Sequence, residues 1–186
     1  MPGQVNRDYS VLKRIQAFAL DYLIIVGYLI LLTIISTLLV YGPLQEDWEQ
    51  VISTPIRMDV LAFVTAILPV ILYFTFFEGS ERGGTWGKQR MNLQVVDMRG
   101  EQLGRRRAFV RAIIKFLPWQ LAHTCLFHIP GWPIAPQEPP TWVFIGLILV
   151  WVLVGAYIVA MVISPRHRTP YDWLAGSQVV VRLNTH

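Results

Sequence analysis

Long apolar runs separated by polar stretches dominate the chain. Residues 15–41 are apolar apart from Asp21 and a few uncharged polar side chains, residues 60–77 form a second run, and residues 141–163 form a third without any charge. A helix needs about 20 apolar residues to cross ~30 Å of hydrocarbon. The pattern therefore predicts three membrane-spanning helices, the second of them kinked at Pro69.

The basic residues are unevenly distributed among the polar stretches. Of the 16 Lys and Arg residues, 15 precede the first run, lie within residues 82–115 or follow residue 163, whereas residues 42–56 carry three acids and no Lys or Arg. Cytoplasmic loops of membrane proteins are enriched in Lys and Arg. We therefore expect both termini, the loop of residues 78–107 and the tail of residues 164–186 to be cytoplasmic.

Two termini on one side of the membrane require an even number of crossings. Residues 108–129 would supply the fourth, an apolar run interrupted by Arg111 and Lys115. These long side chains could extend toward the inner surface. The predicted fold is an all-α membrane protein, a four-helix transmembrane bundle with a small cytoplasmic β element, in a single domain over residues 1–186.

Shorter patterns predict structure in the cytoplasmic segments. Thr85 is suited to cap a short helix over residues 86–90. Residues 92–98 and 178–183 alternate in the manner of strands, and residues 170–175 resemble one or two helical turns closed by a glycine. We expect the two strands to lie together as a small antiparallel sheet.

Composition supports the membrane interpretation. Apolar residues make up 54% of the 186 residues and charged residues 15%, against roughly 45–50% and about 25% in soluble domains. A soluble enzyme, a disordered tail and a secreted disulfide scaffold are therefore disfavoured, the last because the chain has a single cysteine. The net charge of +4 is interpreted as loop charge that faces anionic lipid head groups, not nucleic acid.

Asp21 is the first candidate for function, because a carboxylate inside a membrane helix costs a few kcal/mol and marks a functional site by default. Arg14 precedes it by nearly two helical turns and is its expected partner, with the small Ala17 between them. Burial would raise the pKa of Asp21 and the guanidinium would lower it. Two interpretations stay open: a proton or cation site, or a pair that stabilises the first helix.

Asp172, directly after the last span, is the second candidate. Its carboxylate could reach back to Arg14 or Arg111 if the short helix folds under the bundle. The alternative is an acid that satisfies free backbone N–H groups at a helix start. No spacing predicts a metal site, a phosphate-binding loop or a catalytic nucleophile, so we expect no metal, no cofactor and no enzyme.

Four motifs in order resemble the RDD family of bacterial membrane proteins, named for one arginine and two aspartates. They are Arg14-x-x-Ala17-x-x-x-Asp21, Gly84-Thr85-x-Gly87-Lys88 with Leu93-x-Val95-Val96-Asp97-x-x-Gly100, an arginine at Arg111, and Asp172-x-Leu174-Ala175-Gly176-Ser177-x-Val179-Val180. The resemblance implies a bacterial inner-membrane protein. It also implies that the family Arg and two Asp are Arg14, Asp21 and Asp172, with Arg111, Thr85 and Lys88 as supporting residues.

Two hypotheses about function remain. In the first, Asp21 exchanges a proton for a cation, as the antiport linked to a few RDD members implies, and the small chain works as a homo-oligomer. In the second, the chain is a membrane adaptor or assembly module that binds lipid head groups or a partner membrane protein, and its Arg and Asp residues hold the fold. A carboxylate of Asp21 that faces a water-filled cavity would favour transport, and one that is closed and dry would favour the adaptor.

Overall fold

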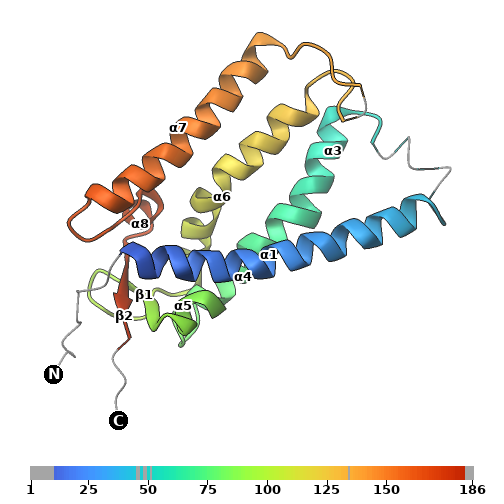
Figure 1. Cartoon of the computed structure of the whole chain (residues 1–186). Coiled ribbons are helices and arrows are strands. Elements are labelled where there is room, and N and C mark those ends of the chain that lie inside the picture. Colours follow the sequence, from blue (N-terminus) through green and yellow to red (C-terminus); the bar gives the residue numbers. More distant parts are fainter. Residues whose placement is uncertain (1–10, 45–46, 48–49, 51, 134, 183–186) are drawn as a thin grey trace. The chain divides into compact units, whose positions relative to one another are not determined.

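The computed structural model describes residues 11–44, 47, 50, 52–133 and 135–182. These residues form two compact units. The described part of the first unit consists of residues 11–25, 70–115 and 155–182, and that of the second of residues 26–69 and 116–154. Figure 1 shows that both are mainly helical and that the strands belong to the first unit.

Among the described residues, three helical segments are long and apolar enough to cross a membrane. They are α1 (Val11–Val40), the segment Pro55–Glu78, and α7 (Thr141–Ile163). No residue in the apolar window of α1 is fully buried, and few are in that of α7, as expected for surfaces that contact lipid. The prediction that the three apolar runs form helices of membrane-spanning length is confirmed. α7 has the predicted bounds, α1 begins at Val11 instead of residue 15, and the second helical segment begins at Pro55 instead of residue 60.

The second span is an α-helix interrupted by a π-helical turn. It consists of α3 (Pro55–Ala62), the turn η1 (Phe63–Ile67) and α4 (Leu68–Glu78). Pro69 lies just after this turn and has no N–H to donate to the carbonyl of Thr65, four residues earlier. In the second unit the hydroxyl of Tyr28 donates to that carbonyl instead.

The run predicted as a fourth span forms α6 (Arg105–Phe127), which begins three residues before the predicted start. Its apolar content is too low for it to count among the three membrane-length helices. Pro118 lies inside it and leaves the carbonyl of Ile114 without its helical donor. In the first unit the hydroxyl of Tyr157 donates to this carbonyl over 2.6 Å. At both prolines, therefore, the hydroxyl of a tyrosine from another helix donates to the carbonyl that the proline leaves without a helical donor.

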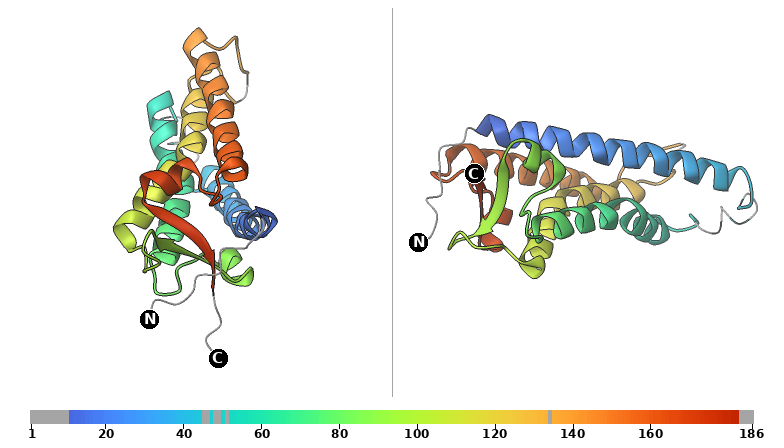
Figure 2. Two further views of the ribbon diagram at one scale, coloured as in Figure 1. Left: turned by 90° about the vertical axis from the view of Figure 1, so that its left-hand side faces the viewer. Right: turned by 90° about the horizontal axis from the view of Figure 1, so that it is seen from below.

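The remaining elements of the first unit are short. They are α5 (Trp86–Arg90), β1 (Leu93–Asp97), α8 (Pro170–Leu174) and β2 (Ser177–Val181). Figure 2 shows the two strands side by side, and they pair antiparallel, which confirms the predicted sheet. The predicted strand and helix positions are correct to within one or two residues, although the predicted end of the second strand at residue 183 lies outside the described residues.

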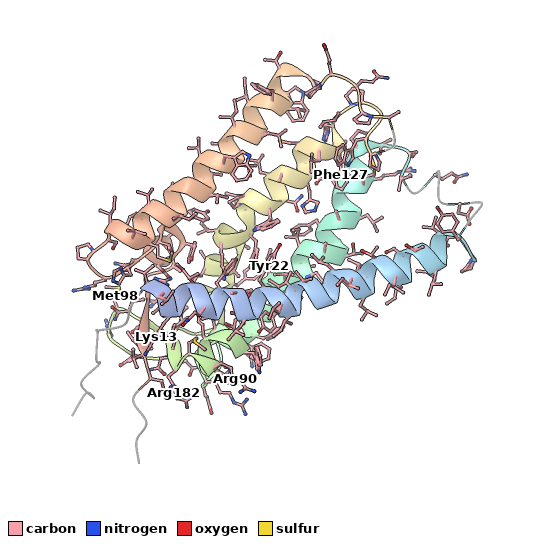
Figure 3. All side chains as sticks on the ribbon, viewed as in Figure 1. Lys13, Tyr22, Arg90, Met98, Phe127 and Arg182 are labelled. Atoms are coloured by element: carbon pink, nitrogen blue, oxygen red, sulfur yellow. The ribbon has the colours of Figure 1, made fainter. Side chains whose placement is uncertain are left out.

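The strand pair is fixed by its register and by a small core. Leu93 lies opposite Val181 and Asp97 opposite Ser177. One face of the sheet packs into a cluster of buried apolar residues with parts of α1 and α6: Ala17, Leu93, Val95, Leu103, Ala108 and Val179. Arg90 and Arg182 point outward near the end of the sheet (Figure 3).

A candidate site of buried charged residues

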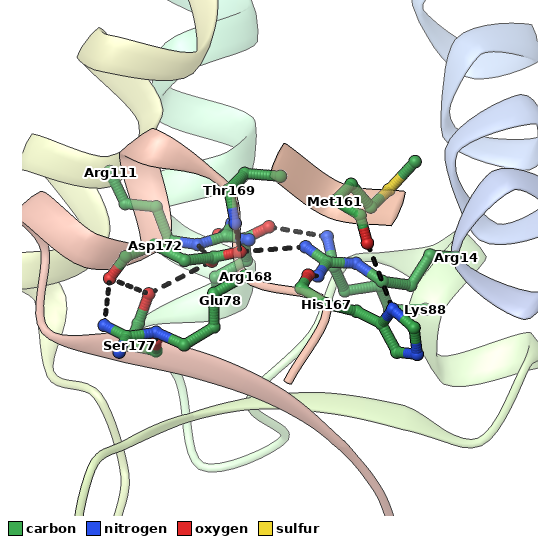
Figure 4. Close-up of polar contacts among 10 residues, drawn as sticks. All are labelled: Arg14, Glu78, Lys88, Arg111, Met161, His167, Arg168, Thr169, Asp172 and Ser177. Carbon is green, nitrogen blue, oxygen red and sulfur yellow. Dashed lines mark hydrogen bonds and ion pairs between the residues drawn. The ribbon is translucent and has the colours of Figure 1, made fainter. Parts of the chain in front are cut away.

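Five charged side chains from five helices meet inside the first unit, and we call them the charge cluster. They come from the start of α1, the end of α4, the middle of α5, the second turn of α6 and the first turn of α8. All five are buried: Arg14, Glu78, Lys88, Arg111 and Asp172. Figure 4 shows them in contact. Members of the charge cluster are up to 158 residues apart in sequence, so the tertiary fold brings them together.

Cations and acids alternate through the charge cluster. Lys88 Nζ lies 2.7 Å from Glu78 Oε1, and the other oxygen of Glu78 accepts from Arg111 Nη1. Arg111 Nε lies 2.9 Å from Asp172 Oδ1, and Arg14 Nη2 lies 3.0 Å from Asp172 Oδ2. Each acid therefore lies between two cations, and Arg111 uses the fork of its guanidinium to join both acids.

Asp172 both caps the start of α8 and forms ion pairs. At the start of α8 its Oδ2 accepts from the backbone N–H of Thr169 over 3.1 Å and from the Thr169 hydroxyl over 2.8 Å. Ser177 Oγ lies 3.2 Å from its Oδ1. Burial raises the pKa of the Asp172 carboxyl, but the charges of Arg111 and Arg14 outweigh burial and hold the pKa well below its usual range. Both sequence interpretations of Asp172 are thus realised together: it caps a helix and it pairs with Arg14 and Arg111.

Arg14 is directed to the end of the chain, not along its own helix. Besides the ion pair with Asp172, it donates to the backbone carbonyl of His167, in the turn that precedes α8. His167 has a positive φ of 50°, and its ring nitrogen Nδ1 lies 3.0 Å from the carbonyl of Met161. The expected ion pair of Arg14 with Asp21 is wrong: the partner of Arg14 is 158 residues away in sequence, not seven.

Asp21 has a site of its own at the start of α5. Only 1% of its surface is exposed. Its Oδ2 accepts from the Thr85 hydroxyl over 2.5 Å, and its Oδ1 accepts from the Gly87 backbone N–H over 2.8 Å and from the Tyr73 hydroxyl over 3.0 Å. The side chain of Thr85 therefore does not cap α5 as predicted, although Thr85 does occupy the N-cap position. A carboxylate from α1 supplies the missing acceptor instead.

The close contact between α1 and α5 depends on glycine at position 87. A Cβ on Gly87 would overlap the carbonyl oxygen of Ala17 and would lie 2.9 Å from the carboxylate carbon of Asp21. Ala17 is itself 1% exposed. The small residues of the motifs are thus what allow a backbone N–H to reach the acid.

Two members of this region were not singled out from the sequence. Glu78 ends an apolar run and precedes a Gly-Ser turn, which is a common place for a solvated acid, yet it is fully buried. Tyr73 lies in the middle of the same run and donates to Asp21. The one signal that could have identified Glu78 is that it is the only acid between residues 60 and 80.

Lys115 adds a further positive charge close to the charge cluster. It lies one helical turn after Arg111, and its ammonium is 3.5 Å from the centre of the Phe74 ring and 5.3 Å from that of Phe18. Contacts of this kind stabilise a cation through the ring quadrupole. The ammonium of Lys115 therefore lies among aromatic rings, and its extension toward a membrane surface stays a prediction.

The second unit has a separate polar contact inside its helices. Asp59 of α3 accepts from the Thr124 hydroxyl over 2.9 Å and from Gln120 Nε2 over 2.8 Å, both on α6. Within the described residues, no group of three His, Cys, Asp or Glu side chains is placed to hold a metal ion.

These features define the class of the protein. Helices of membrane length with uncovered apolar surfaces, joined to a small sheet and a buried set of ion pairs, are those of an integral membrane protein. The chain belongs to the RDD family, whose sequence model matches residues 9–176. No curated protein and no solved structure matches the chain.

Proposed function

We propose that the protein is a non-enzymatic membrane module that serves as an adaptor or assembly partner, and that its buried charges hold the fold together. The main support for this proposal is the enclosed environment of the Asp21 carboxylate. Its carboxylate is buried and accepts three hydrogen bonds from the same chain. A carboxylate with such partners is held in place as a structural acceptor between α1 and α5.

The proposal includes a location and a topology. The chain would lie in the bacterial inner membrane with four crossings and with both termini, the 78–107 loop and the sheet in the cytoplasm. The length of α6 supports a fourth crossing, because 23 residues extend for about 34 Å at ~1.5 Å per residue. Arg111, a charge that would oppose insertion, is neutralised by Glu78 and Asp172.

The partners of such a module would be the lipid bilayer and a membrane protein, either a second copy of this chain or another subunit. The uncovered apolar faces of α1 and α7 supply surface for helix packing in the membrane. Exposed arginines of the first unit, among them Arg90, Arg105 and Arg106, supply positive charge toward anionic head groups. No nucleic acid is needed to account for this charge.

Cation/proton antiport is the second candidate, and one observation favours it: an acid lies within the membrane-length helix α1. For transport, Asp21 would have to exchange the donors Thr85, Gly87 and Tyr73 for water in another conformation. A proton and a cation would then compete for the same carboxylate.

A paired experiment separates the two candidates. Proton flux driven by sodium, lithium or potassium gradients is measured in proteoliposomes with the wild type, Asp21→Asn, and Glu81→Gln as an exposed-acid control. The adaptor proposal expects no flux from folded wild type and a lower unfolding temperature for Asp21→Asn only. Flux that is present in the wild type and the control, and absent from a well-folded Asp21→Asn variant, would overturn it in favour of antiport.

A further inference from the structure

A pocket of about 760 Å³ opens on the surface of the first unit, between β1, the start of α6 and α8. One part of its wall is charged, with three arginines and two acids: Arg99, Arg106, Arg107, Asp97 and Glu101. Another part is apolar and includes Trp173 and Leu174. One ligand in the pocket could therefore contact both charged and apolar side chains.

The charges of the wall are not all engaged. Asp97 accepts from the backbone N–H groups of Arg99 and Glu101 over 2.8 and 3.0 Å, and its carboxylate lies 3.6 Å from Arg107 Nη1. Arg107 is thus balanced by an acid of the protein. Arg106 is exposed and makes no ion pair with any residue of the described chain, so its guanidinium is available to an anion.

The apolar part of the wall is presented by a fixed element. Asp172 anchors α8 to the charge cluster through Arg14 and Arg111, and this leaves the next two side chains on the outside. Trp173 is 49% exposed and Leu174 69% exposed. Tryptophan beside basic residues is typical of the interface between head groups and hydrocarbon.

We propose that this pocket binds an anionic phospholipid, with the phosphate at Arg106 and the upper acyl chain along Trp173 and Leu174. A phospholipid joins an anion to a hydrocarbon chain, which is the combination that the two parts of the wall require. The inference rests on the proposed topology, because that topology places the start of α6 and α8 at the cytoplasmic leaflet.

The test uses the full chain in nanodiscs of phosphatidylcholine with increasing phosphatidylglycerol. Phosphatidylglycerol brominated near the head group quenches tryptophan, and the difference between wild type and Trp173→Phe isolates the signal of Trp173. We expect quenching by brominated phosphatidylglycerol but little by brominated phosphatidylcholine. Arg106→Gln should raise the half-saturating fraction about fivefold, the effect of one basic residue near a charged surface.

Arg105→Gln is the matched control. It removes the same charge one residue earlier. The Arg105 guanidinium carbon Cζ lies 5.8 Å from the centre of the Phe76 ring, and this side chain does not line the pocket. An equal rise of the half-saturating fraction in both variants would show only a general attraction of the basic surface for anionic lipid, and it would overturn the proposal. So would equal quenching by the two lipids, or full displacement of the lipid by millimolar glycerol phosphate.

A separate measurement keeps failure of the topology distinct from failure of the pocket. Arg82→Cys in a Cys125→Ser background places one cysteine in the 78–107 loop, and a membrane-impermeant maleimide reports its side. Labelling from outside intact inner membranes would overturn the topology and, with it, the basis of the lipid site. Labelling only after lysis, combined with no preference for phosphatidylglycerol, would overturn the lipid site alone.

Discussion

Removal of Glu78 should destabilise the protein more than removal of Arg111, although Arg111 is larger and joins both acids. The charge cluster holds three cations and two acids, a net charge of +1. Arg111→Gln would divide it into two neutral pairs, Lys88 with Glu78 and Arg14 with Asp172. Glu78→Gln would leave three cations with one acid and a net charge of +2.

The magnitudes follow from this difference. Leaving a buried charge without its partner costs about 3–5 kcal/mol, which is the loss of unfolding free energy that we expect for Glu78→Gln, since Lys88 loses the carboxylate 2.7 Å away. Arg111→Gln breaks two charged hydrogen bonds, but each remaining charge of the cluster keeps a partner of opposite sign. It also removes a buried guanidinium that is costly to desolvate. Its expected cost is about half as large.

Unfolding by SDS in mixed micelles, followed by tryptophan fluorescence, measures both losses. Exposed Glu81→Gln is the control and should change the free energy by less than about 0.5 kcal/mol. Adding Lys88→Gln to Glu78→Gln returns the net charge to +1 and should recover part of the loss, a coupling that a double-mutant cycle isolates. If Arg111→Gln costs as much as Glu78→Gln, or if the double variant is the least stable, the reasoning from charge balance is refuted. Should Glu78→Gln fail to accumulate, recovery of expression in the double variant tests the same point.

Two further predictions concern Gly87 and acid pH. Gly87→Ala should lower the unfolding free energy by about 1–3 kcal/mol through overlap with the Ala17 carbonyl, whereas Gly155→Ala, with open space around its Cβ, should leave it unchanged or raise it; equal thermal melts for the two variants would contradict the close contact. Because the pKa of Asp172 is lowered in the folded protein, its stabilisation is present above the unfolded value of about 3.9 and is lost as pH falls below it toward the folded pKa. Unfolding temperatures of wild type should therefore drop below about pH 4 more steeply than those of Asp172→Asn, and parallel pH curves would refute this origin of the acid sensitivity.

The sequence was most informative where the determinant is local. The apolar run that ends at Ile163 predicts α7 to the residue, and the alternating stretch around Val95 predicts β1, because length and period depend on neighbouring positions only. Partners were less predictable. Asp21 and Arg14 lie on one helix, so their pairing is the natural expectation from sequence. In the structure Asp21 instead accepts from Thr85, 64 residues away, and Arg14 donates to Asp172, 158 residues away.

Glu78 shows a second reason for such errors. An acid at the end of a helix next to glycine looks solvated when only its neighbours are considered. Its burial becomes reasonable only with Lys88 and Arg111 beside it, and their positions depend on α5 and α6. A charge can be buried at low cost in free energy only when oppositely charged or hydrogen-bonding groups surround it. Those groups are brought to Glu78 by the tertiary fold.

The long separation between Arg14 and Asp172 has a consequence for biosynthesis. Asp172 is synthesised 158 residues after Arg14, so the ion pair cannot form until α8 has left the ribosome. Until then Arg14 lacks Asp172, and Arg111 has only one of its two acids. A chain that stops before α8 would keep Glu78 as the one acid of the charge cluster, so synthesis of α8 supplies the second acid that Arg14 and Arg111 share.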